Sequence, residues 1–186
     1  TTASGSRSTA MGDNTEASGG YSTAMGSYTE ASAYLSTAMG VLTAATATGS
    51  TAMGYGAEAS GNYSIGMGWY TTASGLGSIA MGHQTLASGS YSTAMGSTTA
   101  ASGSYSTAMG KTTTASGAYS IAMGRYTTAG SYAETSIGHF NTDYTPMGAT
   151  SWNTGDRLFV IGNGLSSMAK SDAMIVYKDG DCLLYT

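Results

Sequence analysis

A 14-residue stretch decides the fold of this chain: STAMGSTTAASGSY, from Ser92 to Tyr105. Met followed by Gly returns at every fourteenth residue, at Met11, Met25, Met39, Met53, Met67, Met81, Met95, Met109 and Met123. Columns of Ser and Ala keep the same period, and no residue is inserted between the copies up to Gly138. Agreement in several columns over so many copies is typical of a repeat protein.

The length of the repeat limits the architecture. Repeats built from helix pairs need about 33 residues or more, and the leucine-rich pattern is absent. Each copy instead contains two short runs between turns that Gly marks, such as residues 8–12 and 15–19. This pattern predicts an all-β fold, a β-solenoid in which each copy forms one coil with two strands and two turns.

Side chains alternate between the two faces of a strand. In the first run, Ser8, Ala10 and Gly12 share one face, and Thr9 and Met11 share the other. Two strands per coil leave a thin interior that only small side chains fill, so we assign the small columns to the interior. The Ala column predicted to lie in the interior of the roll is Ala3, Ala17, Ala31, Ala45, Ala59, Ala73, Ala87, Ala101, Ala115 and Ala129. The variable column expected to face solvent includes Glu16, Glu30, Glu58, Thr72 and Thr114.

The face that carries Met is neither small nor polar. An exposed apolar stripe of this length marks an association site, so we expect other copies of the chain to cover it. Closed rotational symmetry is expected, because an open contact between unlike surfaces would aggregate; the repeat alone leaves the number of chains open. The predicted oligomer interface consists of the nine Met residues listed above together with Ile65, Ile79, Ile121 and Ile137.

Composition excludes several classes of protein. Only 19 of 186 residues are Val, Ile, Leu or Phe, too few for the core of a conventional enzyme. No run of about 18 apolar residues is present to span a membrane, and six Lys and Arg residues are too few for a basic nucleic-acid binder. A single cysteine, Cys182, excludes an internal disulfide and a cysteine-based metal site; we expect its side chain to be a small buried hydrophobe.

No catalytic, metal-binding or cofactor-binding residues are predicted. The sequence has neither a G-x-S-x-G elbow nor a phosphate-binding loop. His83 and His139 share a column four periods apart, too far for a common ligand. The Met residues are interpreted as packing groups rather than as an array for a soft metal. The chain is therefore expected to be non-enzymatic and to hold no cofactor.

Aromatic side chains are the one feature that indicates recognition. Rigid amphipathic rings suit a binding surface, although stacking between neighbouring coils or between protomers explains them equally well. The candidate ligand-facing aromatics are Tyr21, Tyr63, Trp69, Tyr91, Tyr105 and Tyr119.

The composition changes after Gly138, which predicts two domains: the coils at 1–138 and a β-rich cap or connector at 139–186. Residues 158–161 and 173–177 are expected to form strands, and Asn163-Gly164 and Asp179-Gly180 mark turns. A solenoid needs such a cap because its last coil exposes unpaired backbone groups. Since Thr1 already lies inside a repeat, we expect the chain to be a fragment of a longer protein.

The repeat S-T/I-A-M-G-x-x-T-x-A-S-G resembles the S-V-A-I-G-x-x-A-x-A-x-G repeat of the YadA-like heads of trimeric autotransporter adhesins. The resemblance covers residues 1 to about 138 and implies a left-handed parallel β-roll that packs as a homotrimer at the tip of a surface fibre. This chain uses Met for Ile and mostly Thr for Val. The segments 155–164 and 171–180 resemble the module that follows such repeats in phage tail-fibre-like proteins and in surface fibres that carry a chaperone domain.

From this resemblance we expect a non-enzymatic homotrimeric head of an extracellular, cell-surface fibre that mediates cell adhesion. Its partners would be its own copies and a host-cell, prey-cell, matrix or glycan ligand that the sequence does not identify. Neither nucleic acid nor a direct membrane span is expected. The alternative is a rigid spacer in a phage-tail-fibre-like or injection-system fibre. Ice binding is a third hypothesis, because Thr-rich solenoids can carry flat outward Thr rows; here the row is Thr-x-Met.

Overall fold

The computed structural model describes residues 1–185, which contain strands and turns but no helix. They form a parallel β-solenoid of about ten turns of about 14 residues, so the predicted all-β solenoid is confirmed. The chain divides into two compact units, Thr1–Tyr91 and Ser92–Thr186, which are described one by one. The division into 1–138 and 139–186 stays a prediction.

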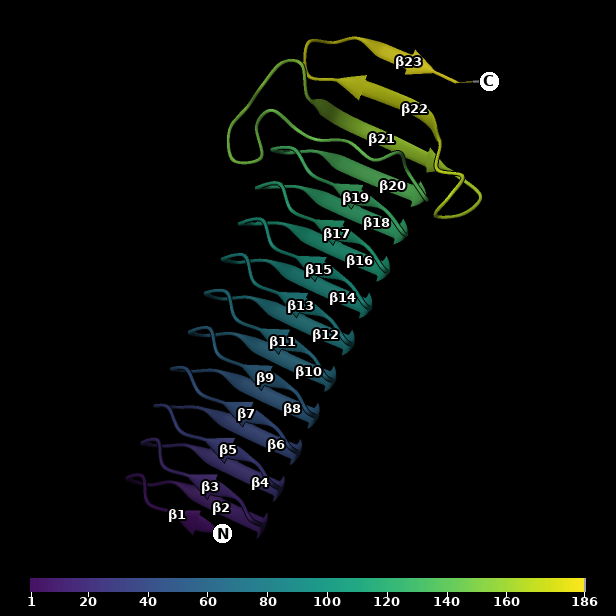
Figure 1. Cartoon of the computed structure of the whole chain (residues 1–186). Helices are drawn as coiled ribbons and strands as arrows, with labels where there is room; N and C mark the ends of the chain where they lie inside the picture. The colour runs from purple at the N-terminus through teal and green to yellow at the C-terminus, as the bar shows by residue number, and fades with distance from the viewer. Residues whose placement is uncertain (186) are drawn as a thin grey trace. The chain divides into compact units, whose positions relative to one another are not determined.

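The first unit contains two kinds of strand (Figure 1). The long strands are β2 (Thr9–Asp13), β4 (Thr23–Ser27), β6 (Thr37–Val41), β8 (Thr51–Tyr55), β10 (Ile65–Trp69) and β12 (Ile79–His83). The short strands are β1 (Thr2–Ala3), β3 (Glu16–Ala17), β5 (Glu30–Ala31), β7 (Ala44–Ala45), β9 (Glu58–Ala59), β11 (Thr72–Ala73) and β13 (Leu86–Ala87). Each strand pairs in parallel with the like strand of the next coil, in a register of one repeat, as in Met67 opposite Met81.

The second unit begins with the same coil and ends differently. Its long strands are β14 (Thr93–Ser97), β16 (Thr107–Lys111), β18 (Ile121–Arg125) and β20 (Thr135–His139), and its short strands are β15 (Ala100–Ala101), β17 (Thr114–Ala115) and β19 (Thr128–Ala129). Three further strands follow: β21 (Arg157–Asn163), β22 (Asp172–Tyr177) and β23 (Cys182–Leu184). β21 joins β20 in parallel, whereas β22 and β23 are antiparallel additions. The two strands predicted after Gly138 are therefore confirmed.

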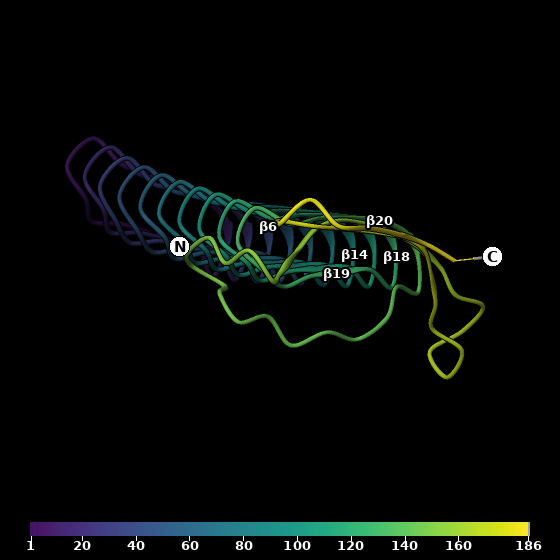
Figure 2. The same cartoon turned by 90° about the horizontal axis from the view of Figure 1, so that it is seen from above.

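Each coil is a flattened loop with a long and a short strand on opposite sides (Figure 2). Its interior holds one Ala from each strand, as with Ala24 and Ala31, and both are fully buried. Ser22 and Thr29 are buried beside them. Because Ala buries little apolar area, the hydrophobic contribution of a coil is small. The backbone hydrogen bonds between coils therefore contribute much of the structural order of the solenoid.

The Gly that follows Met does not lie in the interior, contrary to the expectation for Gly12. This column is mostly exposed, and the backbone conformation at this position requires Gly. Gly26 has φ of +126°, and a Cβ built on it would lie 1.9 Å from the carbonyl oxygen of Gly40 in the next coil. Neither the conformation nor the space tolerates a side chain.

The two turns of each coil share one unusual conformation. We call the turn before each long strand corner A and the turn after it corner B; they include residues 20–21 and 27–28, respectively. Within residues 1–185, seventeen residues other than Gly have positive φ, all between 43° and 60°, and they lie at the two corners, seven residues or a multiple of seven apart. Tyr21 and Tyr28 are examples, with N–H groups that donate to Ser6 and Asp13 of the preceding coil. These inter-coil bonds hold side chains in a backbone region that L-residues usually avoid.

Candidate functional site

The outward face of the long strands carries the predicted interface residues. Within each unit, Met lies beside Met of the next coil, as in Met67 beside Met81 and Met95 beside Met109. Most of these side chains are half-buried, and Met11, Met67 and Met123 are exposed. Ile65, Ile79 and Ile137 are half-buried and Ile121 is exposed on the same face. The structure thus gathers the ladder on one side of each coil, and its coverage by other chains stays a prediction.

The apolar face continues into the C-terminal strands, which sequence reasoning missed. One column runs in register from Ile137 through Ile161 and Met174 to Leu184. The neighbouring column runs from Thr135 through Phe159 and Val176 to Cys182. The sequence held a signal for this: Phe-Val-Ile-Gly at 159–162 repeats the apolar-small-apolar-Gly order after 24 residues instead of 14.

The expectation that Cys182 is buried was wrong, because its side chain is exposed. β23 is the last strand of the sheet, and Cys182 lies beside Val176 on its outward face. No further layer of the described chain covers that face.

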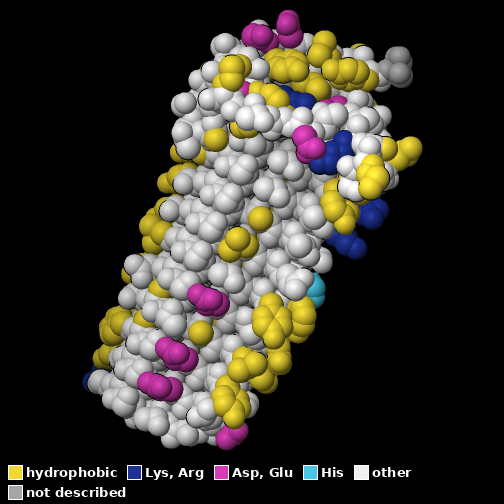
Figure 3. Space-filling view, viewed as in Figure 1, with side chains coloured by type: hydrophobic (Ala, Val, Ile, Leu, Met, Phe, Trp, Pro, Cys, Tyr) yellow, Lys and Arg dark blue, Asp and Glu magenta, His cyan; other side chains and the backbone are white. Residues whose placement is uncertain are grey.

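The predicted interior Ala column lies inside the coils. From Ala17 to Ala129 each of its members is 0% exposed. Ala3 is an exception and is exposed, because no coil lies on its N-terminal side in the described chain. In the predicted solvent column, Glu16, Glu30 and Glu58 are exposed, whereas Thr72 and Thr114 are half-buried. Acidic side chains, in magenta, are visible on this surface in Figure 3.

The candidate aromatics are exposed and also contact neighbouring coils. At corner A, Tyr63 is 64% exposed, and Tyr21, Tyr91, Tyr105 and Tyr119 are about half exposed. The rings of Tyr105 and Tyr119 stack with centroids 4.9 Å apart, and Tyr21 meets Tyr34 edge to face. Both interpretations of the Tyr residues, stacking and display, therefore keep a structural basis.

Trp69 lies at corner B rather than with the Tyr column. It stacks on His83 of the next coil with centroids 4.4 Å apart, and its edge meets Tyr70. Val41, Leu42 and Tyr55 add exposed apolar surface at the same corner of the first unit.

A buried polar cluster closes the last coil of the second unit. The Glu134 side chain accepts hydrogen bonds from the N–H groups of Gly130 and Ser131, at 2.9 and 2.8 Å. Burial raises the pKa of Glu134 despite these bonds. Lys178 donates to Ser131 Oγ at 3.0 Å, and burial lowers the pKa of Lys178. A Ser beside a Lys can form a nucleophile and its base, but Ser131 is fully buried and donates its own proton to the Arg157 carbonyl. The contact is therefore structural.

Asp156 organises the loop that follows the last coil. Its carboxylate accepts bonds from the N–H groups of Met147 and Gly148, both at 2.8 Å, and from the Tyr144 hydroxyl. Burial alone would raise the pKa of Asp156, but these three donors outweigh it and the pKa is lowered. Burial and the same bond raise the pKa of Tyr144.

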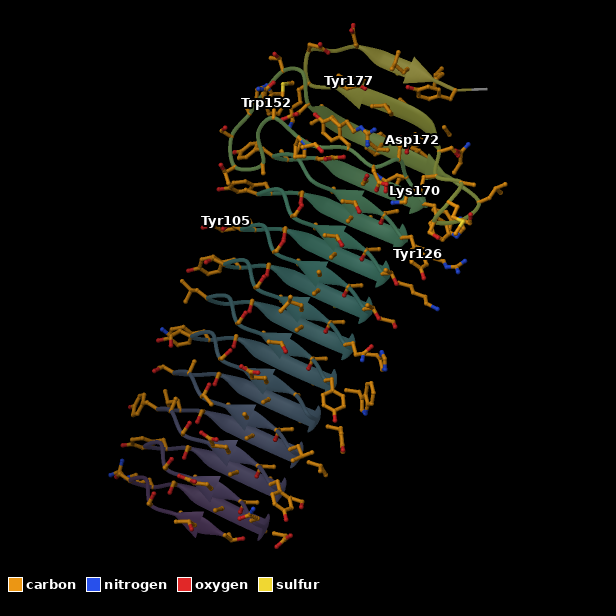
Figure 4. All side chains as sticks on the ribbon, viewed as in Figure 1. Tyr105, Tyr126, Trp152, Lys170, Asp172 and Tyr177 are labelled. Atoms are coloured by element: carbon orange, nitrogen blue, oxygen red, sulfur yellow. The ribbon has the colours of Figure 1, made fainter. Side chains whose placement is uncertain are left out.

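A hollow of about 290 Å³ lies beside this loop, lined by residues that include Arg157, Asp172, Tyr177 and Tyr185. Arg157 and Asp172 form a buried ion pair with 3.7 Å between Nη2 and Oδ2. Lys170, also on its wall, pairs with Asp143 (Figure 4). The charges around this hollow are thus matched within the chain.

Within residues 1–185, no three His, Cys, Asp or Glu side chains are grouped as a metal site would require. The same residues contain no helix long and apolar enough to cross a membrane.

The repeat matches the family model of the YadA head domain repeat, which describes two copies at a time. Matches cover residues 3–29, 31–57, 45–71, 73–99 and 101–127. A search of curated proteins finds no match. Because the family model covers more than half of the residues and the coils have the geometry derived above, this chain belongs to the YadA head repeat family.

Proposed function

We propose that this chain forms the homotrimeric head of an extracellular surface fibre and that the head mediates attachment to cells or matrix. The observation that carries the proposal is the outward apolar face, which extends in register from the Met column into β21, β22 and β23. Heads of the YadA type are typically homotrimeric, and the family is of a structural, adhesin type.

Burial of this face between protomers would favour association. Complete burial of a Met or Ile side chain contributes about 1.5–3 kcal/mol. Met109, Met123, Ile137, Ile161 and Met174 are each partly exposed on the second unit. Burial of the area that is still exposed, repeated on each protomer, works against the roughly 4–15 kcal/mol that association costs in lost freedom.

Light scattering on the purified chain tests the oligomer. The wild type is expected at three times the mass of 18.6 kDa. The double variant Met109→Glu and Met123→Glu should dissociate, because it places charges in the interface. A matched control is Thr114→Glu with Thr128→Glu, since Glu already occupies that column at Glu58 in another coil; this control should stay trimeric. A monomeric wild type would refute the trimer.

Attachment is tested separately with beads coated with the trimer. The head function predicts that beads adhere to cultured cells or to matrix proteins, and that the soluble trimer competes. A rigid spacer of a tail-fibre-like or injection-system fibre would give trimers that do not adhere.

A further inference from the structure

Corner B of the second unit carries two cationic side chains, Lys111 and Arg125, which we call the basic strip; His139 follows them in the same column. They occupy the same position in three successive coils, and the strand register places Lys111 beside Arg125 and Arg125 beside His139. Neighbouring strands lie about 4.8 Å apart, so the row advances by about that distance per coil. Dark-blue side chains project from this edge in Figure 3.

No carboxylate neutralises the strip. The sequence has no Asp or Glu between Glu58 and Glu134, although the whole chain has a net charge of −4. Glu134 is buried and accepts from Gly130 and Ser131. Asp143, the next acid along the chain, is paired with Lys170 at 2.5 Å. The positive charge of Lys111 and Arg125 therefore faces solvent uncompensated within the described chain.

The Arg125 guanidinium is held in place by its neighbours. Its Cζ atom lies 5.4 Å from the centroid of the Tyr126 ring and 5.5 Å from that of Phe140. Its Nη1 atom is 3.2 Å from His139 Nε2, while His139 Nδ1 is 2.7 Å from the Gly164 carbonyl oxygen. Because a carbonyl only accepts, Nδ1 of His139 donates and Nε2 accepts from Arg125. One of the five guanidinium N–H groups is thus used for positioning, and the side chain is ordered before any ligand arrives.

We propose that the basic strip, with Tyr126 beside it, binds an anionic polysaccharide through its sulfate or carboxylate groups. The inference rests on the proposed function and deepens it by naming a ligand class. Two cations one coil apart fit a chain whose charges are spaced along its length. The half-buried Tyr126 ring (Figure 4) offers an apolar edge to sugar C–H groups. Duplex nucleic acid is disfavoured, because its binders draw their affinity from many phosphate contacts and the whole chain has only six Lys and Arg residues. Three copies in a trimer would strengthen weak single contacts.

Binding of the trimer to immobilised heparin tests the proposal. The variant Lys111→Gln with Arg125→Gln should lose about tenfold in affinity, since it removes both charge contacts from each of the three protomers. Arg7→Gln at corner A and Lys170→Gln, whose charge is already paired, are matched controls and should bind as the wild type does. Retention should fall steeply with added salt.

Competition and oligomeric state separate the outcomes. Soluble dextran sulfate should displace the trimer from heparin, whereas uncharged dextran should not. Equal displacement by duplex DNA at the same charge concentration, or an equal loss in the control variants, would refute a site for anionic polysaccharide. A trimer that adheres to cells but shows no strip-dependent heparin binding overturns this inference and leaves the head function standing. Binding by a monomer that does not adhere would contradict the head function instead.

Discussion

The repeated coils and the C-terminal segment satisfy equivalent backbone N–H groups with different acceptor atoms. In a regular coil, the N–H groups of Ser116 and Gly117 both point at the Ala129 carbonyl oxygen of the next coil, at 2.9 and 3.3 Å. In the last coil, the equivalent N–H groups belong to Gly130 and Ser131, and Oε2 of Glu134 accepts both. A repeat supplies partners for every coil but its last, so the last coil departs from the repeat.

The short strands show the same contrast. The Thr114 N–H donates to the Thr127 carbonyl of the next coil at 2.8 Å. The Thr128 N–H instead donates to Oδ1 of Asn141 at 2.8 Å, and Nδ2 of Asn141 donates back to the Thr128 carbonyl at 2.9 Å. A side-chain amide thus replaces a peptide group. One edge is closed by side chains, whereas the sheet of long strands is extended by β21.

The largest loss of stability is expected at the Gly column after Met, where the next coil leaves no room for a side chain. Gly26→Ala would place a Cβ 1.9 Å from the Gly40 carbonyl oxygen at φ of +126°. We expect a loss of about 3 kcal/mol or more in the free energy of unfolding, because clash and backbone strain add. Urea denaturation at fixed protein concentration measures it. Gly20→Ala is the control: its Cβ meets only the Tyr34 ring, at 3.3 Å, and it should cost far less.

The next largest effect is expected at Glu134, the residue by which the last coil departs from the Ser column. Glu134→Ser installs the residue that the other coils use in this column, such as Ser120. It leaves the N–H groups of Gly130 and Ser131 without their acceptor, so we expect a loss of about 2 kcal/mol in unfolding free energy. Glu134→Gln keeps an acceptor oxygen and should lose less. An unchanged urea midpoint for the Ser variant would show that this edge needs no acceptor.

Glu134 and Asp156 should also respond to pH with opposite signs. The pKa of Glu134 is raised from its ordinary value of 4.5, so its ionisation reduces stability as pH rises through the folded-state pKa. The pKa of Asp156 is lowered, so the stability it contributes is lost as pH falls through its folded-state pKa. Unfolding midpoints measured against pH should show Glu134→Gln gaining on the wild type as pH rises above about 4.5.

A smaller effect, this time a gain in stability, is expected at corner A of the last coil. Ala133 has φ of +56°, where Gly loses nothing and Ala is strained. Ala133→Gly should raise the free energy of unfolding by about 0.5–1 kcal/mol. Ala100→Gly, in a short strand with ordinary φ, should lower it by a similar amount. Equal signs in the two variants would contradict the role of backbone conformation.

The smallest effect concerns charges that the repeat brings together. Glu16 and Glu30 lie directly opposite each other on β3 and β5. Glu30→Gln should stabilise the first unit by a few tenths of a kcal/mol at low salt. The gain should vanish in 1 M salt, where the screening length is about 3 Å. A gain that persists in salt would have another cause.

The columns explain which features could be predicted from the sequence. The 14-residue period predicted one coil per repeat, and the alternation of side chains along a strand placed Ala24 inside and Met25 outside. It misplaced Gly26, because a small residue needed for φ looks the same as one needed for space. The positive φ of Tyr21 could not be predicted, because it depends on a hydrogen bond to Ser6 of another coil. Glu134 replaces Ser in its column, and the sequence shows this change but not that its carboxylate accepts from Gly130 and Ser131 of its own turn. The pairing of the Asn141 side chain with Thr128 is not encoded by any periodicity.

The identity of the coils has a consequence for how the chain finds its register. Most long strands share an Ala-Met-Gly core, so pairings that skip one coil differ little in energy from the correct one. Glu134, Asn141 and Phe159–Gly162 each occur once and fit only the end of the stack. These residues fix the register of the last coil, and each preceding coil can then pair in register with the one that follows it. We therefore expect a chain with one whole repeat removed or added to fold in phase, provided that this terminal segment is kept.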